Sequence, residues 1–281
     1  MADRILSDFE ISYIKQGVLA DMRSDGRSCR DYRSFELRSG IVSNTSGSAE
    51  IKLERTNILV GVKAEIGQPN PLNPNKGRIE FFVDCSALAS PKFEGRRGED
   101  LGRNLAHRLS DLYENSNCID LESLSIIPGQ DCWIIYVDAL VLEYSGGVLD
   151  CLSIAVKGAL ANTKIPKLTV IGEGEEQEIE ISDNPFDSTS IDTNNVPVFV
   201  SLSLIGNQFI VDASHEEEAC SLCQLSVGVN HKGSICSILK EGAGSFKHRQ
   251  YNEAISLASE IGVSVIEKIT LTNNTAPEKM L

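Results

Sequence analysis

The sequence predicts an α+β fold built from two similar halves, and three features of the chain support this prediction. Short apolar runs typical of strands fill residues 35–83 and again residues 196–239. In both halves the strand-like part leads into apolar residues at helical spacing. An acidic and polar stretch over residues 172–195 separates the halves. Strands followed by helix, repeated once, are typical of an α+β chain with an internal pseudo-repeat.

Composition fits a globular protein and limits how the chain can meet nucleic acid. The 281 residues are 41% hydrophobic, which is enough for a sizeable core. The net charge of −14, from 26 Lys and Arg against 40 Asp and Glu, argues against a broad basic surface that wraps nucleic acid. Any RNA contact is therefore expected to be local or shared with a partner.

Neither a secretory signal nor a membrane span is expected. The first ten residues lack the apolar core of a signal peptide, and no apolar run reaches membrane-spanning length. The 8 cysteines are scattered, mostly within apolar segments, which is typical of buried thiols in a reducing compartment. The sequence therefore predicts an intracellular protein with no membrane partner.

The N-terminal half opens with a predicted helix. Ser7 and Glu10 have the spacing of a capping box. The residues that share one helical face are Ile11, Ile14, Val18 and Met22. We expect this helix to end near Asp25 and Gly26. Strand-like runs follow from Phe35, with Gly47 and Gly61 as bends, and residues 70–77 form an Asn- and Pro-rich loop.

Two more helices are predicted in this half. The first covers Glu99–Tyr113 and has leucines at helical spacing at 101, 105, 109 and 112. A long apolar strand, Cys132–Leu142, then leads into the Gly146–Gly147 turn. The helix after the turn is defined by Leu149, Leu152, Val156 and Leu160. This strand, turn and helix form the local unit most typical of a chemical site.

The C-terminal half is predicted from the same kinds of pattern. Its expected strands are Val196–Leu204, Gln208–Val211, Leu222–Val229 and Ser234–Leu239, and its expected helix is His248–Ile269. We therefore divide the chain into an N-terminal half over residues 1–171, an acidic connection over 172–195 and a C-terminal half over 196–271. Residues 272–281 are expected to form a flexible tail.

Several site types receive little support from the sequence. Cys220 and Cys223 have the spacing of a metal pair, but no second pair completes a site, so two buried thiols are favoured. The four histidines, at positions 107, 215, 231 and 248, stand singly and are assigned surface or capping roles. Residues 241–245 are Gly-rich and precede the last helix. A plain turn capped by Ser245 is favoured there over an anion site.

Two features leave alternatives open. Asp212 and Glu218 lie at the end of a predicted strand and could hold Mg²⁺ or transfer a proton, but a solvated acidic turn over Ser214–Glu217 is the more frequent reading of such a run. Arg96 and Arg97, between Gly95 and Gly98, could contact phosphates, although a lone pair of arginines in an acidic chain is a weak signal.

Strings of residues spread along nearly the whole chain resemble the RNase PH superfamily. They are Arg23–Arg27, Asp31–Arg33, Gly47–Ala49, Thr56–Val60, the Gly146–Gly147 turn and Asp212–Glu218. Longer strings over residues 42–49, 60–65 and 80–86 are similar, within that superfamily, to ring subunits of the RNA exosome. The resemblance implies the RNase PH-like fold, also described as ribosomal protein S5 domain 2-like, as one domain over residues 1–281.

The resemblance also implies a site that has lost its phosphate clamp. Active members of the superfamily degrade RNA from its 3′ end by phosphorolysis. They hold phosphate with a Gly-Gly turn at a helix N-terminus and with a hydroxyl and Arg pair that follows it. Gly146 and Gly147 match the turn, but Val148 and Leu149 stand at the hydroxyl and Arg positions, followed by Asp150. We expect Asp150 to cap the third helix.

The other site residues of the superfamily match more closely. Active members use two Asp residues for a metal ion or a proton. Asp212 matches the first, and the longer Glu218 stands at the second, so we interpret the two as vestigial carboxylates and expect no metal. Arg96 and Arg97 lie in the segment that grips RNA in active relatives, and Arg103 lies one to two turns further on. We expect these arginines to face RNA in a ring channel.

From the resemblance we expect a non-catalytic subunit, without cofactor, of a six-membered exosome ring that processes and degrades RNA in the nucleus, nucleolus and cytoplasm. The expected partners are RNase PH-like subunits, with side-by-side pairing to an active-type homologue, S1/KH cap subunits, and RNA that passes through the ring. An active phosphate-dependent 3′–5′ exoribonuclease is the alternative. A third hypothesis keeps this chain inactive but lets Arg96 or Arg97 bind RNA beside a neighbour's active site.

Overall fold

The computed structural model of the chain describes residues 6–172, 178–182, 184 and 187–275. Its helices are α1 Asp8–Leu19, the 3₁₀ helix η1 Pro91–Phe93, α2 Arg96–Ser116, α3 Val148–Ala161, α4 His215–Cys220 and α5 His248–Thr275. Its strands are β1 Phe35–Ser39, β2 Gly47–Leu53, β3 Thr56–Gly67, β4 Arg78–Cys85, β5 Ser125–Ile127, β6 Asp131–Glu143, β7 Lys164–Pro166, β8 Leu168–Ile171, β9 Glu178–Ile181, β10 Ser188–Ser190, β11 Val198–Ile205, β12 Gln208–Val211, β13 Cys223–Val229 and β14 Ile235–Glu241. The predicted α+β class is confirmed.

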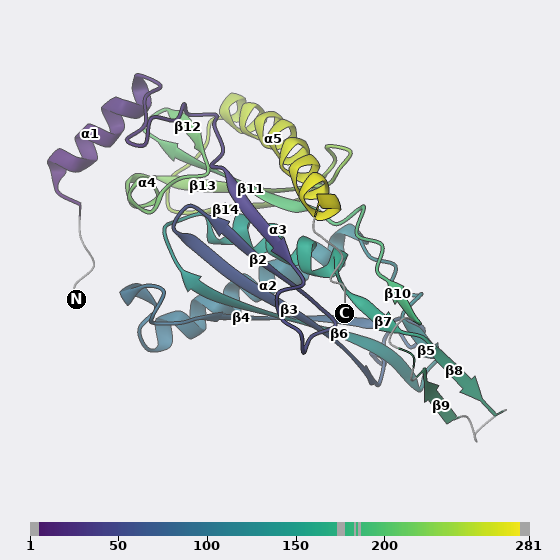
Figure 1. Cartoon of the computed structure of the whole chain (residues 1–281). Coiled ribbons are helices and arrows are strands. Elements are labelled where there is room, and N and C mark those ends of the chain that lie inside the picture. Colours follow the sequence, from purple (N-terminus) through teal and green to yellow (C-terminus); the bar gives the residue numbers. More distant parts are fainter. Residues whose placement is uncertain (1–5, 173–177, 183, 185–186, 276–281) are drawn as a thin grey trace.

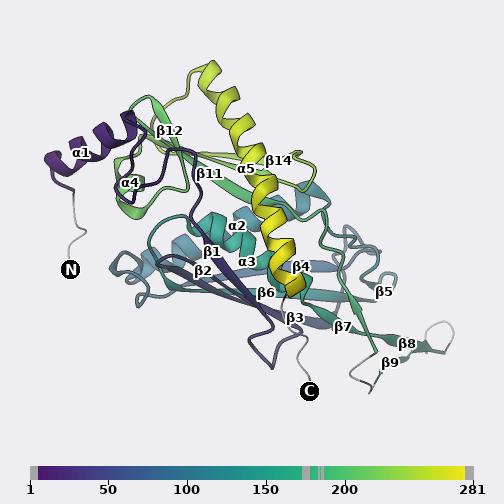
Figure 2. The same cartoon turned by 45° about the horizontal axis from the view of Figure 1, so that its top comes forward.

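The elements stack in layers, with helices between two sheets (Figure 1). The larger sheet has the strand order β1–β2–β3–β6–β4, and only β4 pairs in parallel, with β6. The second sheet has the order β12–β11–β13–β14 and is antiparallel. Helices α2 and α3 lie between the sheets, and α5 covers the outer face of the second sheet (Figure 2). At opposite ends of the molecule lie α1 and the β8–β9 hairpin (Figure 1).

Helix α3 is the buried centre of this arrangement. All residues from Val148 to Leu160 are buried. The helix packs on β2 and β3 of the larger sheet and on β11 of the second sheet. A helix that is apolar on all sides is expected only where protein covers it completely. The first turn of α3, where the phosphate clamp would stand, is therefore also enclosed by protein.

The end of the first helix differs from the prediction. Helix α1 begins with the predicted capping box, in which Ser7 and Glu10 bond each other's backbone N–H groups, but it ends at Leu19. The N–H of Met22 donates to the carbonyl of Gly17 at 2.9 Å, and the N–H of Asp21 donates to that of Val18 at 3.2 Å. These bonds form a Schellman motif, with Asp21 in the left-handed conformation at φ 53°. Met22 therefore lies outside the helix and is 67% exposed.

The predicted bends at Gly47 and Gly61 are also wrong, because Gly47 opens β2 and Gly61 lies inside β3. A Cβ atom on Gly47 would lie 2.3 Å from the hydroxyl of Thr163 and 2.7 Å from the carbonyl of Ala159. The glycine thus allows β2 to approach the last turn of α3 closely. Close approach of two backbones is a second reason for a glycine inside a strand.

Elements in the C-terminal half begin and end away from their predicted limits. The last helix begins at His248, so Ser245 does not cap it, and it continues to Thr275, so residues 272–275 are helical and not a tail. Residues 276–281 of the predicted tail lie outside the described residues. In the predicted connection, β9 pairs with β8 and β10 pairs with β7. No helix within the described ranges is long and apolar enough to cross a bilayer.

Candidate functional site

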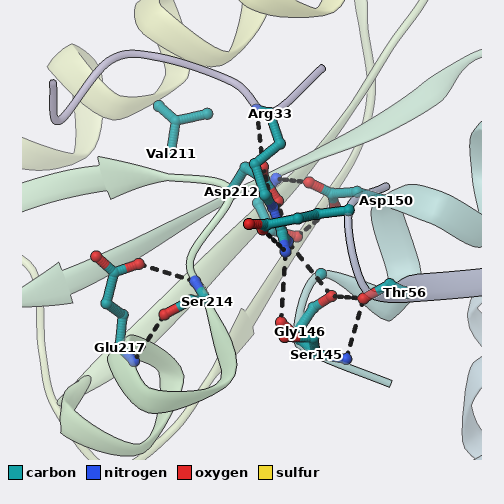
Figure 3. A network of polar contacts seen from close by, with 12 residues as sticks. Arg33, Thr56, Ser145, Gly146, Asp150, Val211, Asp212, Ser214 and Glu217 are labelled. Atoms are coloured by element: carbon teal, nitrogen blue, oxygen red, sulfur yellow. Dashed lines mark hydrogen bonds and ion pairs between the residues drawn. The ribbon is translucent and has the colours of Figure 1, made fainter. Parts of the chain in front are cut away.

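The Gly146–Gly147 turn joins β6 to α3 at the centre of a polar network (Figure 3). Both glycines have positive φ, 93° and 68°. A Cβ atom on Gly146 would lie 2.7 Å from the carbonyl oxygen of Ala213, so no other residue fits there without a backbone shift. The hydroxyl of Thr56 fixes the turn by accepting the N–H of Ser145 at 3.1 Å and donating to the carbonyl of Gly146 at 2.9 Å. The predicted turn is therefore present and rigidly held.

The backbone N–H at the start of α3 is already bound by a carboxylate of this chain. The N–H of Gly147 donates to Oε1 of Glu218 at 2.8 Å, and the Tyr144 hydroxyl donates to Oε2 at 2.9 Å. Burial raises the pKa of Glu218, while these two hydrogen bonds act in the opposite direction. Glu218 thus occupies a donor that a helix N-terminus offers to an anion.

The three residues after the turn face inward. Val148 and Leu149 belong to the main hydrophobic core. Asp150 is fully buried, and its carboxylate accepts the N–H of Ser201 at 2.9 Å and the Ser201 hydroxyl at 2.6 Å. The prediction that Asp150 caps α3 is wrong, because Asp150 lies in the first turn on the side that faces β11, and Gly147 is the N-cap. Burial raises the pKa of Asp150 to about 7.

Asp212 follows β12 and is bound by arginines from the start of the chain. Its carboxylate accepts Nε and Nη2 of Arg33, both at 2.7 Å, and the Arg33 backbone N–H at 3.0 Å. Nη1 of Arg27 donates to it at 3.2 Å. Asp212 is fully buried and has φ 48°, a left-handed conformation that Asp tolerates better than most residues. Burial alone would lower the pKa of Arg33, but the bonds to Asp212 raise it above its ordinary value.

A third arginine joins the same corner to α4. Nε of Arg23 donates to Glu217 at 2.8 Å, and Nη1 and Nη2 donate to the carbonyls of Val211 and Asp212, each at 2.9 Å. Glu217 also completes a capping box with Ser214 at the start of α4. The strings Arg23–Arg27 and Asp31–Arg33 therefore hold the end of β12 and the start of α4 in place.

The predicted carboxylate pair is thus resolved into two separate roles. Asp212 is held by Arg33 and Arg27, and Glu218 is held by Gly147 and Tyr144. The alternative of a solvated turn over Ser214–Glu217 is wrong, since this segment forms the start of α4 and Glu217 is buried. Within the described ranges, no group of three or more His, Cys, Asp or Glu residues is placed to hold a metal ion.

The predicted RNA-contacting arginines lie at the start of α2. Arg96, Arg97 and Arg103 are exposed, and Arg103 pairs with Asp100 at 3.2 Å. The segment just before α2 reaches the turn, because the ring of Phe93 packs on that of Tyr144 with centroids 5.1 Å apart. The structure therefore places the start of α2 next to an element that contacts the site, but it gives these guanidinium groups no direct bond to the turn.

The remaining sequence-based expectations concern His and Cys residues. His215 lies in the first turn of α4, where its ring packs edge-on against Tyr144 and its N–H donates to the carbonyl of Ser145 at 3.1 Å. Cys220 and Cys223 are buried free thiols, as favoured from the sequence, and burial raises the pKa of each.

Sequence reasoning missed the roles of Arg33, Arg27, Arg23, Tyr144 and Thr56. The three arginines lie in strings that the resemblance had singled out, and this was the only available signal. Tyr144 and Thr56 carry no local signal, since each acts on a group that is distant in the sequence or on a backbone atom.

Comparisons with known proteins agree with this geometry. The chain matches the models of the 3′ exoribonuclease family, RNase PH, with domain 1 over residues 31–166 and domain 2 over residues 195–261. The first match contains the Gly146–Gly147 turn, and the second contains Asp212 and Glu218.

Two curated relatives are similar over nearly their full length. The protein named "Putative exosome complex exonuclease RRP42" of Dictyostelium discoideum is 37% identical, over 93% of this chain and 95% of the relative. The "Exosome complex component Rrp42" of Thermococcus kodakarensis is 34% identical, over 94% of each chain.

Solved structures are similar in fold. A chain of the structure described as "archaeoglobus fulgidus exosome with RNA bound to the active site" has a TM-score of 0.79 and 27% identity, and the match covers 93% of this chain and 98% of that one. A chain of an "Archaeal exosome core" has a TM-score of 0.76 at 24% identity, over 94% and 97% of the two chains, and supports the fold alone.

Proposed function

The chain belongs to the 3′ exoribonuclease (RNase PH) family, and from this premise we propose that it is a structural subunit of an exosome ring that does not itself carry out phosphorolysis. The observation that carries the proposal is the bond from the N–H of Gly147 to the carboxylate of Glu218. An internal anion takes the donor that phosphate would need.

The charges around the turn are also wrong for phosphate. The positive charge nearest to the turn, Arg33, is already matched by Asp212 in a two-bond pair. The side chains after the turn, Val148 and Leu149, are apolar and buried and offer no charge-assisted hydrogen bond. A carboxylate about 4 Å from a phosphate charge would repel it by about 4 kcal/mol at an effective dielectric constant of 20. Glu218 and Asp212 would both act in this direction.

The ring role rests on the relatives, which are named as exosome components, and on full-length similarity to them. In this proposal the chain pairs side by side with an active-type RNase PH-like subunit, and S1/KH subunits cap the ring. RNA passes through the assembly, and Arg96, Arg97 and Arg103 face it. The chain contributes architecture and RNA threading, while a neighbour contributes the phosphate chemistry.

The test uses the chain assembled with its ring neighbours. Glu218→Gln keeps a carbonyl oxygen for the Gly147 N–H but removes the charge, and Glu216→Gln on the exposed side of α4 is the matched control. Native mass measurement should give a ring with each version. Phosphate-dependent RNA decay by the ring should be equal for the wild type and both variants. A decrease of tenfold or more with Glu218→Gln alone would mean that this chain takes part in catalysis.

A further inference from the structure

Helix α1 carries two apolar stripes on opposite faces. Ile14 and Val18, four residues apart, are buried in a small core with α4 and β12. Phe9 and Tyr13, also four residues apart, lie on the other side and are 80% and 63% exposed. A short surface helix needs only one apolar stripe to dock on its own protein. The stripe of Phe9 and Tyr13 therefore has no role in folding this chain.

A hollow beside this second stripe could receive a side chain. It has a volume of about 260 Å³ and lies between Leu6, Phe9 and Tyr13 on one side and Ser24 and Glu216 on the other. Exposed aromatic side chains next to an apolar hollow are typical of sites where another protein binds. Both views place α1 at one end of the molecule, away from the two sheets, where a second protein can reach it (Figures 1 and 2).

The charges around the hollow indicate which kind of partner fits. Glu10 and Glu216 lie at its rim, and among the described residues that line it none is basic. This rim disfavours RNA, whose phosphates it would repel, and a second copy of this chain, which would bring the same acidic rim. It favours a protein surface that inserts an apolar side chain and places Lys or Arg opposite the two glutamates.

We infer that the stripe of Phe9 and Tyr13 with its hollow is the docking surface for a neighbouring subunit of the ring, which inserts an apolar side chain flanked by basic residues. This inference rests on the proposed function, because it takes the partner from the same ring. Docking there would place the neighbour next to α4, which supplies Glu217 and Glu218 to the degenerate site.

The variants that test this inference leave the fold intact. Phe9→Ala combined with Tyr13→Ala removes the outer stripe but leaves Ile14 and Val18 in the core. Leu72→Ala combined with Leu88→Ala is the matched control, since both leucines are highly exposed and lie elsewhere on the molecule. Glu216→Lys reverses one rim charge without changing the apolar surface.

The experiment titrates the purified chain against the RNase PH-like subunits of its own ring and measures assembly by native mass. The double aromatic variant should assemble at least tenfold more weakly, Glu216→Lys should also weaken assembly, and the leucine control should behave as the wild type. Amide hydrogen exchange over residues 8–24 should slow when the wild-type chain enters the ring.

Two failures of the experiment can be told apart. A ring that forms equally well with the double variant, with unchanged exchange over residues 8–24, overturns the docking surface and leaves the proposed function standing. Protection of α1 only by a protein outside the ring also overturns it. A wild-type chain that enters no ring overturns the proposed function and the docking surface together.

Discussion

Replacement of Asp212 by Asn should destabilise the protein strongly, because Asp212 neutralises a buried arginine. The side chains of Asp212 and Arg33 are 0% and 4% exposed. The carboxylate accepts two guanidinium bonds and one backbone bond from Arg33, and one bond from Arg27. Removing one partner of a buried ion pair typically costs about 3–5 kcal/mol. This is a large part of the roughly 5–15 kcal/mol that stabilises an ordinary domain.

Asn is the right substitution because it isolates the charge. Position 212 has φ 48°, and Asn tolerates this left-handed conformation, whereas Ala would add backbone strain. The matched control is Glu36→Gln, which breaks the exposed Glu36–Arg38 pair, whose side chains are 70% and 62% exposed. Exposed pairs contribute only about 0–1 kcal/mol. The difference between the two variants therefore measures the effect of burial.

Urea unfolding followed by the fluorescence of Trp133, the chain's single tryptophan, measures both variants. We expect Asp212→Asn to lose about 3 kcal/mol or more and Glu36→Gln to lose less than about 1 kcal/mol. A loss below about 1 kcal/mol for Asp212→Asn would refute the reasoning. It would mean that the carboxylate is not needed by Arg33 and is free for other chemistry.

Three further predictions follow from the same site. Asp150 has a pKa of about 7 in the folded chain, above its ordinary 3.8, so the folded state binds this proton more tightly and its stabilising effect is lost as pH rises from about 4 to 7. Asp150→Asn should therefore gain stability relative to the wild type over this range, by up to roughly 4 kcal/mol in urea unfolding, and a difference that does not change with pH would contradict this. Gly147→Ala should cost about 2 kcal/mol or more, because a Cβ there meets Asp212 at 3.0 Å and Arg33 at 3.1 Å, whereas Gly26→Ala, also at positive φ but in open space, should cost only about 1 kcal/mol; equal thermal shifts for the two would remove the packing argument. Arg96→Glu combined with Arg97→Glu should weaken RNA binding by the assembled ring and reduce its salt dependence, and unchanged binding would remove both residues from the RNA path.

The sequence predicts the start of a helix better than its end. The capping box of Ser7 and Glu10 placed the start of α1 correctly, since the signal lies within four residues. The end of α1 was missed because Asp21, and not a glycine, takes the left-handed position of the Schellman motif. Helix α4 has the same kind of box, Ser214 and Glu217, but its six residues are too few to show an apolar period. Its start could have been found from the box alone.

The degenerate site was predicted in part. The Gly146–Gly147 turn and the apolar Val148 and Leu149 could be found from the resemblance, because they are adjacent in the sequence. What replaces the missing clamp could not be found. The bond from Gly147 to Glu218 joins residues 71 positions apart, and the bonds from Arg33 to Asp212 span 179 positions. Such contacts depend on how α3, β12 and α4 pack, which no local pattern reports.

Asp150 shows how packing overrides a local rule. An acidic residue in the first turn of a helix is expected to interact with the helix N-terminus. Here the side chain points from α3 to β11, where Ser201 offers both a backbone N–H and a hydroxyl. The prediction failed because the strand on the other side of the helix is not visible in a sequence pattern.

The most direct test of the central claim is phosphorolysis by the purified chain alone. The chain is incubated with 3′-labelled single-stranded RNA, inorganic phosphate and Mg²⁺, and release of nucleoside diphosphates is followed. An active RNase PH-like enzyme serves as the positive control. Because Glu218 holds the Gly147 N–H and no charged side chain replaces the missing clamp, we predict no phosphate-dependent release above background. Phosphate-dependent release that Glu218→Gln abolishes would contradict the account.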